Sequence, residues 1–141
     1  MNLYLDTSIF VAALCDEAST ERVLRWMHGQ SDSQFITSRW TFTEFSSAVS
    51  IKVRTGQLAA SHQPMLITRF NSLIVNQVSL VAVVDGDFPT AARFCENWQS
   101  GLRGGDALHL AIAATCADTL ATLDNGLYRA ARHFGIAALI P

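Results

Sequence analysis

Lysine is almost absent from this chain. The 141 residues contain one lysine, Lys52, beside nine arginines. Any mechanism that requires a catalytic or phosphate-binding lysine therefore has a single candidate. Charged residues make up only 16% of the sequence and the formal net charge is -2. This balance excludes a strongly basic nucleic-acid coat, so a nucleic acid would have to be bound at a local site.

Cysteine and proline are also scarce, with three of each. Cys15, Cys95 and Cys116 form an odd set without a CxxC pair, and each has apolar neighbours, which is typical of reduced thiols in a core. The N-terminal segment has no basic region of a signal peptide, and no apolar run reaches the ~18 residues that cross a bilayer. We therefore expect a cytoplasmic protein that does not contact a membrane.

Half of the sequence is hydrophobic. A chain of this length buries about 70% of the surface that its unfolded form exposes, so it needs no disulfide or structural metal to build a core. Disorder and fibrous repeats are excluded, and no linker or internal repeat is visible. We expect a single domain over residues 1–141.

Hydrophobic patterning predicts alternating strands and helices. Strands are expected at 3–5, 34–37, 79–84, 119–123 and 136–140, and helices at 9–14, 17–29, 38–56, 59–76, 89–100, 106–117 and 127–134. Thr7 or Ser8 is the expected cap of the first helix. This order indicates an α/β sandwich with a mostly parallel central sheet flanked by helices. Ligands of such sheets bind beyond the carboxyl ends of the strands.

Four acids interrupt apolar segments: Asp6, Glu44, Asp106 and Asp124. Burying an ionised carboxylate without a partner is very costly, and these segments contain no lysine and little arginine. A divalent cation would supply the missing positive charge. Magnesium and manganese suit carboxylate ligands and leave positions for water and a substrate phosphate.

Each acid also has an ordinary explanation. Asp6 and Asp106 could cap helices, Glu44 could be an exposed helix residue, and Asp124 could belong to a turn. Their joint placement beside hydrophobic segments favours a shared site over these separate roles. Asp85 and Asp87 also follow a strand, and for them a turn or cap is the preferred interpretation.

The order and spacing of these motifs resemble the PIN-domain family, and within it the VapC-type toxins of bacterial toxin–antitoxin modules. The resemblance covers essentially the whole chain. It is carried by Leu5-Asp6-Thr7-Ser8, by Glu44, by Gly105-Asp106-Ala107-Leu108-His109-Leu110-Ala111, and by Ala121-Thr122-Leu123-Asp124. Many members have a charged and then an aromatic residue after the last acid, whereas this chain has Asn125-Gly126.

The resemblance implies a PIN-like three-layer sandwich and a metal-dependent endoribonuclease that acts as a toxin. Mg²⁺ or Mn²⁺ would be held by the four acids, with Glu44 as a ligand or as the group that orients the attacking water. Ser8 and Thr122 would donate hydrogen bonds to those carboxylates or to bound water. The implied partners are an RNA substrate, a second copy in a homodimer, and a VapB-type antitoxin whose C-terminal segment lies between the early helices.

Positive charge near the acids would bind RNA phosphates. Arg39, Arg103 and Arg129 are the candidates because each is close in sequence to one of the acids. His109 shares a helix face with Asp106, and we expect a hydrogen-bonded core histidine there rather than a base or ligand. Large aromatics are expected mostly in the core, although some could contact the antitoxin: Trp26, Trp40, Phe42, Phe45 and Trp98.

Four other functions were weighed against this one. A receiver domain would need a lysine late in the chain, and Lys52 lies in an early helix. A haloacid-dehalogenase-like phosphatase would need an acid at Ser8. A flap or DNA nuclease uses similar acids but generally carries extra substrate-threading elements, for which 141 residues leave no room. The main alternative is a catalytically silent PIN-like module that binds RNA or a protein.

Overall fold

The computed structural model describes residues 1–141. It contains five strands, seven α-helices and two short 3₁₀ segments. In chain order these are β1 (Asn2–Leu5), α1 (Thr7–Leu14), α2 (Thr20–His28), β2 (Gln34–Ser38), α3 (Trp40–Arg54), η1 (Ala60–His62), α4 (Gln63–Gln77), β3 (Val78–Val81), α5 (Asp87–Glu96), η2 (Trp98–Ser100), α6 (Gly104–Cys116), β4 (Thr119–Ala121), α7 (Asn125–His133) and β5 (Ala138–Leu139).

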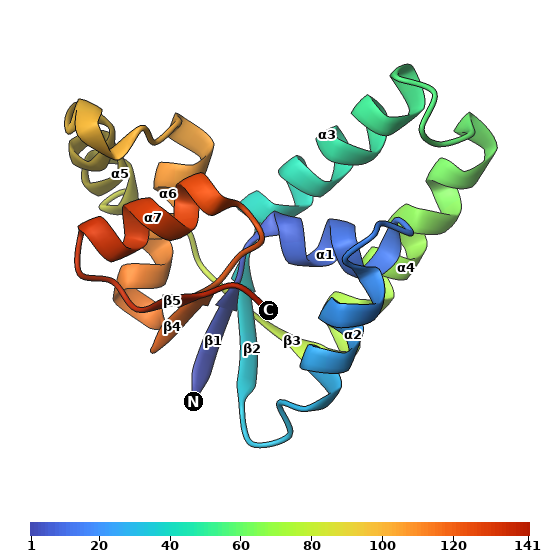
Figure 1. The fold of residues 1–141 in the computed structure, drawn as a ribbon, viewed down its shortest axis with the longest axis horizontal. Coiled ribbons are helices and arrows are strands. Elements are labelled where there is room, and N and C mark those ends of the chain that lie inside the picture. Colours follow the sequence, from blue (N-terminus) through green and yellow to red (C-terminus); the bar gives the residue numbers. More distant parts are fainter.

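The strands form one parallel sheet in the order β3-β2-β1-β4-β5. β1 is central, with Tyr4 opposite Ile36 of β2 and Leu120 of β4. Helices α1 to α4 lie on one side of the sheet and α5 to α7 on the other (Figure 1). The predicted three-layer α/β sandwich is therefore confirmed, and the carboxyl ends of its strands meet at one edge.

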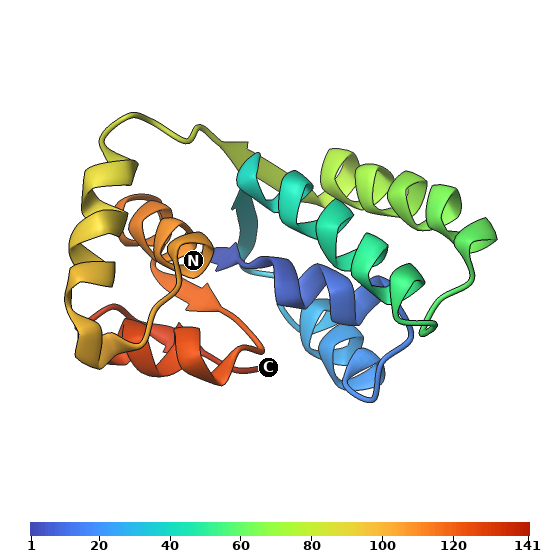
Figure 2. The same cartoon turned by 90° about the horizontal axis from the view of Figure 1, so that it is seen from above.

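Alternate residues of β1 enter different cores, as the geometry of a strand requires. Leu3 and Leu5 belong to the core under α1 to α4, whereas Tyr4 belongs to the core under α5 to α7. All three side chains are fully buried. The view from above shows the two helical groups separated by the sheet, with α3 and α4 running side by side (Figure 2).

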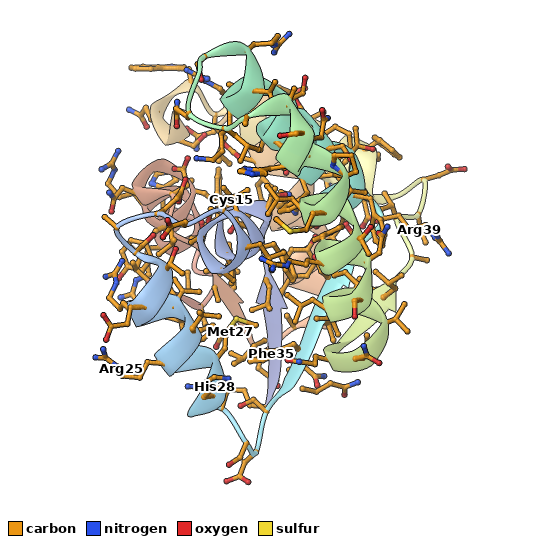
Figure 3. All side chains as sticks on the ribbon, turned by 90° about the vertical axis from the view of Figure 1, so that its right-hand side faces the viewer. Cys15, Arg25, Met27, His28, Phe35 and Arg39 are labelled. Atoms are coloured by element: carbon orange, nitrogen blue, oxygen red, sulfur yellow. The ribbon has the colours of Figure 1, made fainter.

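The first core is built around aromatic rings from several helices. Phe70 of α4 stacks on Phe45 of α3, with ring centroids 4.2 Å apart, and meets Phe10 of α1 edge-on at 5.5 Å. Along the amphipathic α2, Met27 faces the sheet beside Phe35 while Arg25 lies on the outer side (Figure 3). These contacts fasten the α1–α4 layer to the sheet.

Three strands are shorter than the sequence predicts, among them β4, which ends at Ala121 rather than at residue 123. β3 ends at Val81 rather than at residue 84, because its last partner is Ser38, where β2 ends. β5 pairs only Ala138 and Leu139 with β4. An edge strand can extend only as far as the neighbour that supplies its hydrogen bonds, and a hydrophobic pattern does not show where that neighbour stops. Asp85 therefore does not lie at a strand end.

Helix α1 begins at Thr7, so the predicted cap at Thr7 or Ser8 is wrong and Asp6 is the residue that precedes the helix. Trp98 also departs from expectation, because it is 83% exposed rather than part of the core. The three cysteines are free and partly buried. No helix has both the length and the apolar character needed to cross a bilayer.

Candidate active site

A cavity of about 500 Å³ lies at the carboxyl edge of the sheet. All four acids singled out in the sequence line it, although they come from four separate elements or connections. Its remaining walls come mainly from α1 and α3: Thr7, Ser8, Val11, Glu17, Ser47, Ala48, Ile51 and Leu123. The fold thus brings together carboxylates that are up to 118 residues apart in sequence (Asp6 and Asp124).

Asp6 is placed by the central strand. Its backbone N–H donates to the carbonyl oxygen of Ala121 at 3.2 Å, which continues the pairing of β1 with β4. The side chain makes no capping bond to α1 and instead accepts a 2.6 Å hydrogen bond from the hydroxyl of Ser8. Burial raises the pKa of Asp6 to about 6, although the charge of His109 and the Ser8 bond oppose this rise.

Glu44 is fixed by two donors on the same oxygen. Its Oε2 accepts a 2.6 Å hydrogen bond from Thr7 Oγ1 and contacts Nε2 of His109. Burial raises the pKa of Glu44, but the hydrogen bond and charge of His109, together with the Thr7 bond, outweigh burial and hold the pKa below its usual value. Glu44 is therefore an ionised and oriented carboxylate rather than an exposed helix residue.

Asp106 and Asp124 are held more loosely. Asp106 lies in the first turn of α6, and no hydrogen bond restrains its side chain. Its pKa is raised by burial and then by the negative charges of Asp124 and Glu44. Asp124 precedes α7, where its Oδ1 accepts from the backbone N–H of Leu127 at 2.9 Å. The turn considered for Asp124 is thus a helix cap in the structure, while its other oxygen stays available to the cavity.

Ser8 and Thr122 join these carboxylates. Besides its bond to Asp6, Ser8 Oγ accepts from the backbone N–H of Leu123 at 2.8 Å and lies 3.5 Å from Thr122 Oγ1. The Thr122 hydroxyl accepts from the backbone N–H of Asp124 at 2.9 Å. The two hydroxyls therefore tie the end of β4 to the start of α1.

The three candidate arginines lie in different places. Arg103 directly precedes α6, three residues before Asp106, and its charge partly opposes the rise in the pKa of Asp106, although Arg103 does not line the cavity itself. Arg39 is at the surface (Figure 3) and lines a second, more apolar cavity together with Trp40 and Phe88. Arg129 is an exposed residue of α7 and does not line the acidic cavity. Of the three, Arg103 is the one that the fold brings to the acids.

His109 is fully buried, as expected of a core histidine. Its Nδ1 lies 2.9 Å from the hydroxyl of Tyr4, and its Nε2 contacts Glu44. Neither contact, nor the position of Thr7 beside Glu44, is predicted by the sequence pattern. Thr7 is a polar residue directly after Asp6, which is a weak signal for a role in the site. The sequence does not show, however, that Thr7 contacts Glu44 of α3 or that Tyr4 contacts His109 of α6.

Residues at the far end of the cavity were also missed. Glu17 lines the cavity, and its Oε1 forms an ion pair with Nζ of Lys52, the only lysine of the chain, at 2.7 Å. Asp87, by contrast, accepts from the backbone N–H of Val84 at 2.8 Å and has the turn role expected for it. Only acids on the walls of the cavity thus remain as candidates for chemistry.

The donor chemistry of the cavity fits a divalent cation. Burial and then the neighbouring carboxylates raise the pKa of Asp106, so a bound cation would relieve repulsion that the protein itself leaves in place. Carboxylate oxygens are the ligands that magnesium and manganese prefer. No three His, Cys, Asp or Glu side chains are already grouped around one point as in a finished metal site. The unrestrained Asp106 and the free oxygen of Asp124 would have to turn toward the ion.

Comparisons with known proteins agree with this architecture. The family model described as PIN domain matches residues 3–133. Ribonuclease VapC35 of Mycobacterium tuberculosis (strain CDC 1551 / Oshkosh) is 27% identical over 144 residues, which cover 99% of this chain and 96% of VapC35.

Solved structures share the fold at lower identity. Mycobacterium tuberculosis VapC20, described as a toxin that cleaves the sarcin–ricin loop, superposes with a TM-score of 0.71 and 16% identity, covering 99% of each chain. A structure of VapBC2 from Rickettsia felis bound to a DNA fragment from their promoter gives a TM-score of 0.66 and 17% identity, covering 99% of this chain and 98% of that one.

Proposed function

This chain belongs to the PIN domain family, and we propose that it is a divalent-metal-dependent endoribonuclease that serves as the toxin of a toxin–antitoxin pair. The observation that carries the proposal is the convergence of Asp6, Glu44, Asp106 and Asp124 on one cavity at the carboxyl edge of the sheet. The names of the relatives agree with it, since VapC35 is a ribonuclease and VapC20 is a toxin that cleaves an RNA loop.

Hydrolysis of a phosphodiester bond needs an activated water and positive charge against the scissile phosphate. A Mg²⁺ or Mn²⁺ ion supplies both functions when bound. Asp6, Asp106 and Asp124 are the residues that would hold it, and Glu44 borders the same space. Because the ionised acids alone repel a phosphate, substrate binding and metal binding are expected to depend on each other.

The hydroxyl residues keep this arrangement in place. Ser8 holds Asp6 from one side and the end of β4 from the other, and Thr122 holds the backbone that leads to Asp124. Groups that orient metal ligands commonly change affinity or activity when they are removed. Ser8 and Thr122 are therefore proposed to support the ligands rather than to react.

Positive charge at the rim of the cavity would bind the RNA backbone. Arg103 is the best-placed residue because it lies next to Asp106, and its guanidinium is exposed and free of ion pairs. Arg39 and Arg129 would contact more distant parts of a strand. Arginine can pair with phosphates and stack on unpaired bases, which suits structured RNA with exposed loops.

The proposed partners follow from the likeness to VapC proteins. A homodimer and a VapB-type antitoxin are expected, and the VapBC2 structure, solved on promoter DNA, is a precedent in a protein of the same fold. The single-domain organisation over residues 1–141 is part of the same proposal. A catalytically silent PIN-like module remains the alternative, and the intact set of four acids argues against it.

An RNA cleavage assay with added Mg²⁺ or Mn²⁺ tests the function. Asp106→Asn should abolish cleavage, because it removes a carboxylate charge from the cavity wall while the amide preserves the shape of the side chain. Folding should be unaffected, since Asp106 makes no hydrogen bond through its side chain and its pKa is already raised by its neighbours.

Asp85→Asn is the matched control, because Asp85 is an exposed acid in the turn after β3 and lies outside the cavity. Its cleavage rate should equal that of the unchanged protein. Metal-dependent cleavage that survives in Asp106→Asn would contradict the assignment of the site. An unchanged protein that binds RNA but never cuts it would favour the silent module.

A further inference from the structure

The environment of Glu44 differs from that of the other three acids. Asp6 is supported by one hydroxyl, Asp124 by one backbone N–H, and Asp106 by no hydrogen bond at all. Glu44 alone has two donors on a single oxygen, and these donors come from two different helices. This asymmetry calls for an explanation in the chemistry of the site, because a ligand that only needed to reach an ion could remain mobile.

Thr7 and His109 hold Glu44 Oε2 from behind. Thr7 Oγ1 donates to it at 2.6 Å and also lies 3.2 Å from Nε2 of His109. The imidazole cannot turn away, because it is fully buried and its Nδ1 is engaged by the Tyr4 hydroxyl at 2.9 Å. The Tyr4 hydroxyl in turn bonds Ser38 at 3.0 Å. A buried chain of polar groups thus ends on one oxygen of Glu44.

Gly105 bounds the other oxygen. A Cβ atom added to Gly105 would lie 2.8 Å from Glu44 Oε1 and 3.5 Å from Cζ2 of the Trp40 ring. Real Cβ atoms essentially never approach within 3.0 Å, so a side chain at position 105 requires the Glu44 carboxylate to shift. A shift of this carboxylate would disturb its bonds to Thr7 and His109. No hydrogen bond of normal geometry reaches Oε1, although the indole of Trp40 lies close by and helps to lower the pKa of Glu44. Oε1 is not among the buried unpaired atoms, so it is accessible from the cavity that Glu44 lines.

We propose that Thr7, His109 and Gly105 form a cradle that fixes the Glu44 carboxylate, so that Glu44 acts in the cavity through Oε1 alone. The cradle residues are positioning residues, because they touch Glu44 and not the substrate. An oxygen held in this way is suited to orienting a water molecule for attack, and a displacement of about 1 Å in such a group can cost ~100-fold in rate. This proposal rests on the nuclease function proposed above.

Neighbouring glycines provide a matched test. Gly105→Ala should lower kcat for RNA cleavage by roughly 10–100-fold while KM changes little, because RNA would be bound elsewhere on the rim. Gly104→Ala should leave both constants unchanged, since a Cβ at Gly104 meets no atom within 4 Å. Equal values of kcat in the two variants would overturn the cradle.

A second pair of variants separates the hydroxyl of Thr7 from its bulk. Thr7→Val keeps the shape of this buried side chain but removes the donor, and it should lower kcat by about 10-fold, the effect expected for one lost hydrogen bond to a charged group. Thr7→Ser keeps the hydroxyl and should restore most of the rate. If Thr7→Val retains full activity, or if Thr7→Ser is as impaired as Thr7→Val, the proposal is wrong.

Proton NMR of the metal-free protein gives a readout that does not depend on cleavage. The Nε2 proton of His109, hydrogen-bonded to Glu44, should give a slowly exchanging downfield signal that is absent in His109→Asn. Gly105→Ala should shift or broaden this signal, whereas Gly104→Ala should not. If the unchanged protein does not cleave RNA, the proposed nuclease function is wrong. If the His109 signal is unaltered in Gly105→Ala, the cradle is wrong, whatever the outcome of the cleavage assay.

Discussion

At the level of single residues, the carboxylic acids of this cavity have pKa values that are shifted in opposite directions. Burial raises the pKa of Asp6 to about 6, whereas the donors around Glu44 hold its pKa below the usual value. The difference arises because Asp6 is the more deeply buried of the two, whereas the less buried Glu44 has the hydrogen bond and charge of His109 and the Thr7 bond to stabilise its ionised form. In the metal-free protein, ionisation is therefore unfavourable at Asp6 and Asp106, whose pKa values are raised.

Replacing Asp6 tests this charge balance. Because the folded-state pKa of Asp6 lies above its ordinary 3.8, the folded protein binds the proton more tightly, and stability falls as pH rises from about 4 to about 6. Asp6→Asn removes the ionised form, so it should raise the free energy of unfolding by roughly 2–3 kcal/mol at pH 8 and by little at pH 4. Urea denaturation of the metal-free protein measures both values.

The control for this measurement is Asp85→Asn, which removes an exposed charge and should change stability by less than about 0.5 kcal/mol at either pH. If Asp6→Asn raises the free energy of unfolding by the same amount at pH 4 and pH 8, the ionised carboxylate is not what destabilises the folded state.

At the scale of elements, the cavity depends on α1, α3 and α4 packing as one unit against the sheet. Thr7 and Ser8 come from α1 and Glu44 from α3, while α4 supplies the aromatic ring that joins these helices. Phe70 is only 2% exposed, and its ring contacts Phe10, Phe42 and Phe45. The position of Glu44 relative to Thr7 therefore rests on apolar packing well away from the acids.

Truncating this ring should be severely destabilising. Phe70→Ala is expected to lower the free energy of unfolding by about 3–5 kcal/mol, because it removes a buried aromatic ring and leaves a cavity. Val75→Ala on the same helix should cost less than about 0.5 kcal/mol, since Val75 is 84% exposed. Chemical denaturation measures both, and a loss below about 1 kcal/mol in Phe70→Ala would contradict the central role of this ring.

At the scale of the whole molecule, the two helical layers contact each other beside the cavity, where His109 of α6 meets Glu44 of α3. Asp106 and His109 come from α6 on one side of the sheet, and Glu44 comes from α3 on the other (Figure 1). An ion bound between Asp6, Asp106 and Asp124 would join both layers to the central strand. Metal binding should therefore stabilise the entire fold and not one helix.

Thermal unfolding with Mn²⁺ tests this coupling. At a free concentration 100 times Kd, a ligand that binds only the folded state adds about 2.7 kcal/mol, which raises Tm by several degrees. The gain should be large at pH 8 and smaller at pH 5, because protons compete for Asp6 and Asp106, whose pKa values are raised. The double variant Asp106→Asn, Asp124→Asn should lose the gain; an equal rise in Tm there would place the ion elsewhere.

Local patterns in the amino-acid sequence predict the kind of fold and the acids that line the cavity. Hydrophobic periodicity and turn residues are local signals, and they predicted every strand and α-helix, with errors confined to boundaries such as the end of β3. The four acids stood out because each interrupts an apolar segment. No charge pattern, however, distinguishes an acid with two buried donors from one with none.

The way in which the acids are held depends on contacts between residues far apart in the chain. The donors to Glu44 come from Thr7 and His109, which are 37 and 65 residues away in sequence, and Gly105 matters through the space that it leaves open. The contact with His109 arises because helices on opposite sides of the sheet approach each other at its edge, and the contact with Thr7 because α1 and α3 pack together on one side. A periodic sequence pattern does not show which helices approach each other. The same reason explains why Arg103 reaches the acids while Arg39 borders a different cavity.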